Sequence, residues 1–81
     1  MFSEEIEEAR QLIAEHGIEI ANELDATGLT WLQWKVLENN VEMVKFLVNN
    51  GADKEITSGK GEKAIDIARR LKFNKLVNLL L

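Results

Sequence analysis

The amino-acid sequence resembles itself when it is shifted by 33 residues. Gly28 then falls on Gly61, and the segment 43–47 falls on 76–80 with apolar residues aligned on apolar ones. Similarity at a fixed period of this length is typical of a solenoid, in which each unit buries its apolar face against the next. The chain has 81 residues, so we expect one domain built from a few stacked units.

Apolar residues at helical spacing predict five helices. They cover residues 4–16, 31–38, 41–50, 64–71 and 76–81. Ser3 and Thr30 stand where N-caps are expected, while Gly17 and the pair Asn39-Asn40 stand where helices end. Residues 17–29 and 49–63 are rich in turn-forming residues, so both segments are predicted to be loops.

Composition argues against several classes of protein. The chain has no cysteine, which excludes disulfides, thiolate metal sites and a cysteine nucleophile. A net charge of −4 argues against nucleic-acid binding. No apolar run approaches the roughly 18 residues that a membrane span needs. The N-terminus is acidic rather than signal-like, so a cytoplasmic, or at least intracellular or recombinant, chain is expected.

Three segments resemble, in register, one repeat of the ankyrin repeat family: DATGLTWLQ (25–33), VEMVKFL (41–47) and NGAD (50–53). The segment 61–81 resembles a final repeat, and 7–20 resembles only the second half of a repeat. The resemblance implies an all-α, short ankyrin-repeat-like solenoid of five helices with projecting loops. It divides the chain into a partial repeat (1–24), a full repeat (25–57) and a C-terminal repeat (58–81).

The helix predicted at 31–38 departs from the family pattern. Trp31 replaces proline, Gln33 replaces histidine, and Lys35 replaces a small buried residue. Gln33 still offers a donor and an acceptor for the adjacent loop. An unpaired lysine is costly to bury, so Lys35 is predicted to face an open edge of the stack.

That edge is expected because the first repeat lacks its inner helix. Trp31 and Lys35 lie four residues apart and share one helical face, and Trp34 adjoins it. Three interpretations stay open. The indoles pack within the chain on the helix 4–16, they form a surface for a partner or a second copy, or they line a small-molecule pocket.

The sequence offers little for catalysis. His16 has no nucleophile or orienting acid at motif spacing, and SGKGEK (58–63) lacks the spacing of a phosphate-binding loop. The acidic residues Glu4, Glu5, Glu7 and Glu8 suit a solvated helix start better than a metal site. The basic residues of the C-terminal half have no aromatic stacking platform beside them. We therefore expect no enzymatic activity, metal or cofactor.

The resemblance implies protein–protein recognition through loop tips and inner helices. The partner is expected to be another protein, with no nucleic acid, membrane or small molecule. An alternative is an engineered or structural self-associating scaffold that forms a homodimer through the helix 31–38. The candidate protein-binding residues are Leu29, Trp31, Trp34, Lys35 and Glu38, together with Ile56, Lys60 and Glu62.

Overall fold

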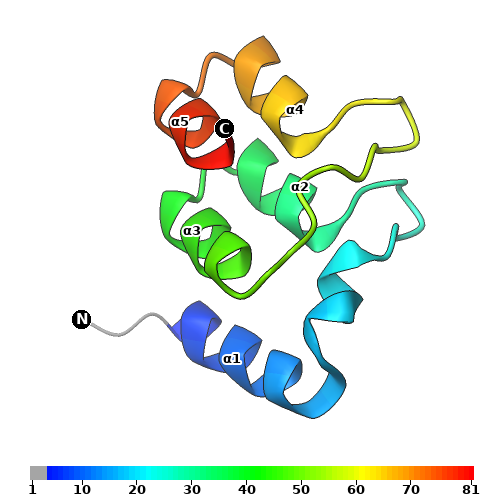
Figure 1. The fold of residues 1–81 in the computed structure, drawn as a ribbon, viewed down its shortest axis with the longest axis vertical. Coiled ribbons are helices and arrows are strands. Elements are labelled where there is room, and N and C mark those ends of the chain that lie inside the picture. Colours follow the sequence, from blue (N-terminus) through cyan, green and yellow to red (C-terminus); the bar gives the residue numbers. More distant parts are fainter. Residues whose placement is uncertain (1–3) are drawn as a thin grey trace.

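The computed structural model describes residues 4–81 and contains five α-helices within that range (Figure 1). In chain order the elements are α1 (Glu4–His16), the 3₁₀ helix η1 (Ile18–Asn22), α2 (Trp31–Leu37), α3 (Val41–Asn49), α4 (Ala64–Arg70) and α5 (Asn74–Leu80). No β-strand occurs over 4–81. The all-α solenoid class is thus confirmed, and the predicted cap Ser3 lies outside the described residues.

The helices stack in layers (Figure 1). The pair α2–α3 lies against the pair α4–α5, with α2 contacting α4 and α3 contacting α5. The helix α1 contacts α3 from the other side and so extends the outer row of helices. The segments that lead into α2 and α4 project on the same side of the stack. Between the layers lies one core, whose buried apolar residues are Ala9, Ala21, Leu32, Val36, Met43, Val44, Leu47, Ala52, Ala64, Ile67, Ala68, Leu76 and Leu80.

Side chains near the helix starts explain where α2 and α3 begin. The Thr30 hydroxyl accepts a hydrogen bond from the Gln33 N–H (3.1 Å), and the Gln33 side-chain oxygen accepts one from the Thr30 N–H (3.0 Å). This reciprocal capping satisfies two amides that the first turn leaves without partners. At α3, Asn40 caps the Met43 N–H at 3.1 Å. The predicted N-cap role of Thr30 is confirmed.

The turn between paired helices requires a left-handed backbone residue. Asn39 has φ of 54° and Lys72, its equivalent 33 residues later, has φ of 62°. These are the two positive-φ residues other than glycine within 4–81. Asparagine tolerates this conformation better than lysine does, because its short side chain can bond locally. The helix break predicted at Asn39-Asn40 is confirmed.

The segment 17–29 differs from the expected loop, because residues Ile18–Asn22 form η1. Gly17 ends α1 with φ of 83° and its N–H bonds the Ile13 carbonyl at 2.7 Å. Within η1, Ala21 is buried in the core, and Ile18 and Ile20 before it are half-buried. Tertiary burial thus holds a short helix that the turn-forming residues around it do not predict. The helix α1 has the predicted bounds, the starts of α2, α3 and α4 are as predicted, and the other helix ends differ from the predicted ones by one or two residues.

Candidate protein-binding surface

The loops before α2 and α4 contain the same tight turn. In the first, the Asp25 N–H donates to the Leu29 carbonyl and the Gly28 N–H donates to the Asp25 carbonyl, both at 2.9 Å. The equivalent bonds in the turn that starts at Ser58 are 2.7 and 2.8 Å. Gly28 and its equivalent Gly61 both have φ of 82°, as predicted for turns that favour glycine.

The two turns are joined to each other. The Gly59 N–H donates to the Gly28 carbonyl at 2.8 Å. A Cβ on Gly28 would lie 3.4 Å from the Gly59 backbone, so the two backbones are in close contact. A row of turns therefore lines the loop side of the stack in a fixed register.

Gln33 connects the inner helix α2 to the second loop. Its side-chain amide donates to the Ile56 carbonyl at 2.9 Å and to the Glu62 carbonyl at 3.4 Å, and its side chain is buried. The prediction that Gln33 bonds the adjacent loop is confirmed. The candidate residue Ile56 accepts this bond through its backbone, and it is itself half-buried.

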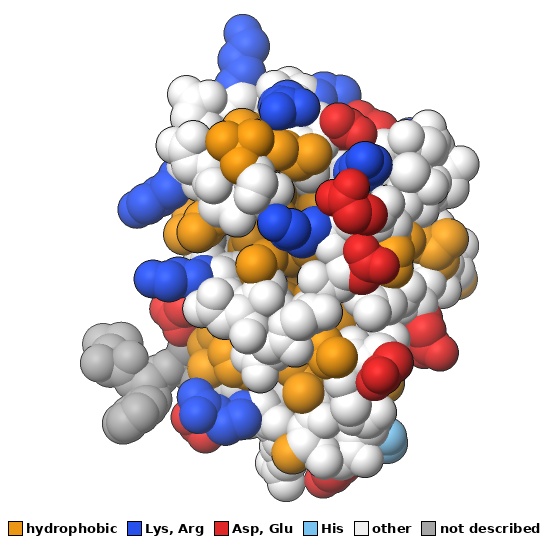
Figure 2. Space-filling view, in the orientation of Figure 1, with side chains coloured by type: hydrophobic (Ala, Val, Ile, Leu, Met, Phe, Trp, Pro, Cys, Tyr) orange, Lys and Arg blue, Asp and Glu red, His pale blue; other side chains and the backbone are white. Residues whose placement is uncertain are grey.

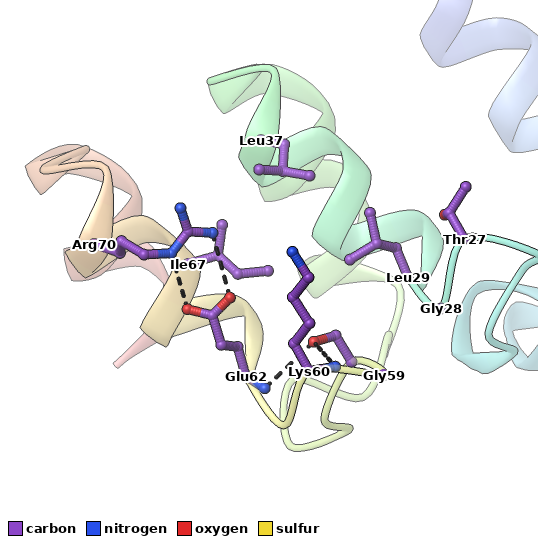
Figure 3. Close-up of a pocket in the computed structure, with 10 residues that line it drawn as sticks. Thr27, Gly28, Leu29, Leu37, Gly59, Lys60, Glu62, Ile67 and Arg70 are labelled. Carbon is purple, nitrogen blue, oxygen red and sulfur yellow. Dashed lines mark hydrogen bonds and ion pairs between the residues drawn. The ribbon is translucent and has the colours of Figure 1, made fainter.

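A hollow of about 200 Å³ lies between α2, α4 and the two turns (Figure 3). Leu29, Leu37 and Ile67 give it apolar walls. At its rim, Arg70 forms a bidentate ion pair with Glu62, with Nε–Oε2 at 3.0 Å and Nη2–Oε1 at 3.3 Å. The hydrogen bonds to Glu62 raise the pKa of Arg70 further above its ordinary value. The candidate residues Leu29, Lys60 and Glu62 thus meet in one place, which we call the inter-repeat hollow.

Lys60 stands apart from this ion pair. Its side chain is exposed and reaches between Ile67 and Leu29 in Figure 3. Its ammonium forms no hydrogen bond or ion pair with any residue of the described range 4–81. The inter-repeat hollow therefore combines apolar walls with one unpaired positive charge.

A second hollow, of about 340 Å³, lies between η1 and α2. Its lining residues are Ile20, Glu23, Leu24, Asp25, Leu29, Trp31 and Trp34. Leu24 is 48% exposed and Trp34 is 37% exposed, so both indole and leucine surfaces are accessible there. Leu29 lines both hollows, so they adjoin at this residue. We call the second one the tryptophan hollow.

Asp25 fixes the orientation of the Trp34 ring. The indole Nε1–H donates to Asp25 Oδ2 at 2.6 Å. The other carboxylate oxygen accepts from the Thr27 hydroxyl, the Thr27 N–H (2.9 Å) and the Leu29 N–H (3.2 Å). These hydrogen bonds, with the Thr27 hydroxyl first and Trp34 next, lower the pKa of Asp25 to about 2. The carboxylate is therefore charged at any pH near neutrality.

The structure places the two tryptophans differently from one another. Trp31 is half-buried and packs against the core, whereas part of the Trp34 ring reaches solvent. Both line the hollow whose other wall includes Ile20 of η1. The flank of α2 is thus covered by η1, a segment that the sequence predicted as loop, while α1 reaches α2 through a side-chain ion pair.

The prediction that Lys35 faces an open edge is wrong. The Lys35 side chain is only 14% exposed, and its ammonium pairs with Glu5 of α1 and with Glu38 at 3.0 Å. Glu5 also accepts a hydrogen bond from the Asn40 side chain at 2.9 Å. Burial lowers the pKa of Lys35, but the bonds to Glu5 and Glu38 outweigh burial and raise that pKa above its ordinary value. The candidate Lys35 therefore holds α1 against the α2–α3 pair, and the candidate Glu38 pairs with Lys35 at the end of the same helix.

Sequence reasoning missed several residues that line the two hollows: Ile20, Glu23, Leu24, Asp25, Leu37, Ile67 and Arg70. The spacing of Ile18, Ile20 and Ala21 was the available signal for η1, but a stretch of three or four residues does not distinguish a short helix from a turn. The position of Leu24 follows from η1 and could not be predicted without it.

Charge is unevenly distributed over the molecule. In Figure 2 most of the acidic side chains in view lie on the loop side, whereas Lys and Arg side chains are spread over the α4–α5 end of the stack and the opposite edge. Among residues 4–81, no group of three or more His, Cys, Asp and Glu side chains could hold a metal ion. None of the helices described is both long and apolar enough to cross a membrane.

Comparison with known proteins finds ankyrin repeat proteins among the relatives of this chain. The human protein named Ankyrin repeat domain-containing protein 40 is 31% identical over 75 residues, which are 93% of this chain and 20% of that protein. Its mouse counterpart is 29% identical over the same lengths. Alpha-latrotoxin-Lg1a of Latrodectus geometricus is 37% identical over 59 residues, or 73% of this chain and 4% of the toxin.

The chain spans about a fifth of the length of the human and mouse proteins. No family model matches it, and no solved structure is significantly similar. The repeat of 33 residues, the stacked helix pairs with their equivalent turns, and these relatives agree with one another. The chain is therefore an all-α solenoid of ankyrin-like repeats, similar to an ankyrin repeat domain-containing protein over 93% of its length.

Proposed function

We propose that this chain is a non-catalytic module that binds another protein through its row of turns and the two hollows beside them. The observation that carries the proposal is that the two hollows adjoin at Leu29, with Leu24 and Trp34 exposed at one end. Exposed apolar side chains gathered in a concave surface with polar rims are typical of protein-interaction sites. Tryptophan in such a surface is among the residues that contribute most binding energy.

The rigidity of the surface supports the same function. Gly59 is bonded to Gly28, Trp34 is bonded to Asp25, and Gln33 is bonded to Ile56. Since these groups are already ordered, a partner would lose little binding energy to ordering them.

Two other interpretations of the tryptophans have less support. Small-molecule sites occupy roughly 300–1,000 Å³ and enclose most of their ligand. The inter-repeat hollow, at about 200 Å³, is smaller than that range. The tryptophan hollow, at about 340 Å³, lies at its lower end, but Leu24 and Trp34 stay exposed there, so it would enclose little of a ligand. A homodimer through 31–38 would need a free flank on α2, but η1 contacts that flank and Glu5 pairs with Lys35.

Capture from an extract of cells that express the chain tests the proposal. We expect the wild-type chain to retain a protein that the double variant Leu24→Ser, Trp34→Ser does not retain. The control is Leu12→Ser, because Leu12 is similarly exposed (43%) but lies on α1, away from both hollows. Capture that is equal for all three chains would contradict the proposal.

Light scattering over a concentration series separates the homodimer from a different partner. The proposal predicts a monomer at micromolar concentration. A dimer that Leu24→Ser, Trp34→Ser dissociates would show that the surface binds a second copy of the chain and would replace our proposal.

A further inference from the structure

We infer that the partner presents a dipolar segment: a lysine or arginine beside an apolar side chain enters the tryptophan hollow, and an acidic side chain farther along reaches Lys60. This inference rests on the proposed function and specifies the chemistry of the partner. It follows from the opposite charges of the two adjoining hollows.

The tryptophan hollow is negatively charged. Asp25 remains ionised because its hydrogen bonds favour the charged form. Glu23 lines the same hollow and is exposed, and its carboxylate makes no hydrogen bond or ion pair within residues 4–81. No lysine or arginine is among the residues that line this hollow. A partner cation therefore meets two carboxylates and no competing positive charge.

The walls of the tryptophan hollow favour a long basic side chain over a small cation. Lysine and arginine carry apolar stems that pack on apolar surface while the charged end stays near water. Cations are also attracted to the faces of tryptophan rings. Leu24 and Trp34 expose the apolar area that such a stem, or a neighbouring apolar residue of the partner, would cover.

The inter-repeat hollow has the opposite character. Its charged lining residues are Lys60, Glu62 and Arg70, and the last two neutralise each other in their ion pair. The ammonium of Lys60 is left without a partner beside the apolar side chains of Leu29 and Ile67. A carboxylate of the partner would pair with it, with apolar surface on one side to exclude water.

The register between the hollows is fixed. Leu29 belongs to both, and the Gly59–Gly28 hydrogen bond holds the two turns together. A segment that crosses Leu29 thus meets negative charge at one end and positive charge at the other. Charge complementarity of this kind sets the direction in which a segment binds.

Selection of displayed random 12-residue peptides against the 81-residue chain tests the inference. We expect the enriched peptides to share a basic residue next to a large apolar one, with an acidic residue at a constant spacing. Binding of the best peptide should weaken about two- to fivefold in Glu23→Gln and in Lys60→Gln, as expected for single charge pairs near a surface. It should be lost in Leu24→Ser, Trp34→Ser.

Matched controls separate these effects from the change in net charge. Glu8→Gln and Lys45→Gln alter exposed residues of the same charge that lie outside both hollows and make no ion pair within 4–81. Both should bind the peptide like the wild type. A peptide whose basic residue is replaced by glutamine should no longer respond to Glu23→Gln, and one whose acidic residue is replaced should no longer respond to Lys60→Gln.

Two results would overturn the inference. One is a set of enriched peptides that need Leu24 and Trp34 but show no charge preference or the reverse one, which would leave the proposed function standing. The other is a selection with no peptide that depends on Leu24 and Trp34. In that case the capture experiment decides separately whether the surface binds a folded protein.

Discussion

The helix α2 meets its neighbours through two unlike faces. Towards α4 it presents Leu32, Gln33 and Val36, each no more than 1% exposed. Towards η1 and α1 it presents Trp31, Trp34 and Lys35, all of them at least partly accessible. The second face has an equivalent in the next repeat, because the corresponding residues of α4 are Ala64, Ile67 and Ala68, which are fully buried against α2.

The difference teaches that the neighbour decides which side chains fit a given position. Where α4 meets a full inner helix, two alanines allow close helix packing. Where α2 meets the five-residue η1, bulky indoles and a lysine fill the wider space. The parts of Trp31 and Trp34 that stay accessible line the tryptophan hollow. An interruption of the repeat thus produces the accessible aromatic surface.

Placing a residue of the second α2 face at its buried equivalent in α4 should have the largest effect on stability. Ala68→Lys places the lysine of the second face, Lys35, at the equivalent position of α4, which is fully buried. Burying an unpaired charge should cost about 3–5 kcal/mol of the free energy of unfolding. Urea unfolding followed by tryptophan fluorescence measures this, and the exposed Arg69→Lys is the control. A loss below about 1 kcal/mol would show that the α2–α4 contact is looser than its burial indicates.

The polar residues of the two inner helices offer a second comparison. Gln33→Ala removes bonds to Thr30, Ile56 and Glu62 from a buried site, so we expect a loss of about 2–3 kcal/mol. Asp66→Ala removes one bond, to the Lys63 N–H, from a half-buried site, and about 1 kcal/mol is expected. Equal losses in thermal or urea unfolding would mean that Gln33 acts as a helix cap alone.

The ion pair between α1 and α2 should contribute less. Lys35→Met keeps the apolar stem but removes the pairing with Glu5, and a loss of about 1 kcal/mol at pH 7 is expected. The hydrogen bond from Lys35 is the main cause that lowers the pKa of Glu5 below its ordinary value of 4.5. The stabilisation is therefore present above pH 4.5 and is lost as the pH falls through the folded-state pKa.

Unfolding of wild type and Lys35→Met across pH 3–7 checks the role of Glu5. The difference in stability between the two chains should shrink towards low pH. If it stays constant, Lys35 contributes through packing and not through its charge. A double-mutant cycle with Glu5→Gln tests the pair directly. Glu5→Gln should lower the free energy of unfolding of the wild-type chain but cause little further loss in a chain that already carries Lys35→Met.

The smallest effect is expected at the turns between paired helices, where the two repeats differ by one residue type. Lys72→Gly removes the Cβ that disfavours the left-handed backbone at this position, so it should stabilise the chain by about 0.5–1 kcal/mol. Asn39→Gly should change stability by less, since asparagine already tolerates this conformation. Thermal unfolding of both variants gives the comparison, and destabilisation by Lys72→Gly would contradict it.

Much of the fold could be predicted from the sequence because its signals are local. The 33-residue period, the cap at Thr30, the glycines of the equivalent turns and the apolar spacing from Val41 onward each depend on neighbouring residues. The period, the turn glycines and the apolar spacing are repeated in the two units, so each unit supports the prediction for the other. The candidate site was predicted only in part. Leu29, Trp31, Trp34, Lys60 and Glu62 do line the hollows, but their division into two charged surfaces was not foreseen.

The sequence by itself determined that this chain is a stack of helix pairs with aligned turns, because helix spacing and turn chemistry act over a few residues. Only the tertiary structure decided what covers the flank of α2. There η1 forms because Ala21 is buried in the core, and Lys35 is accommodated because Glu5, 30 residues earlier, supplies its charge partner. Both contacts join segments that are distant in the chain, so their energies arise only once the fold has brought those segments together.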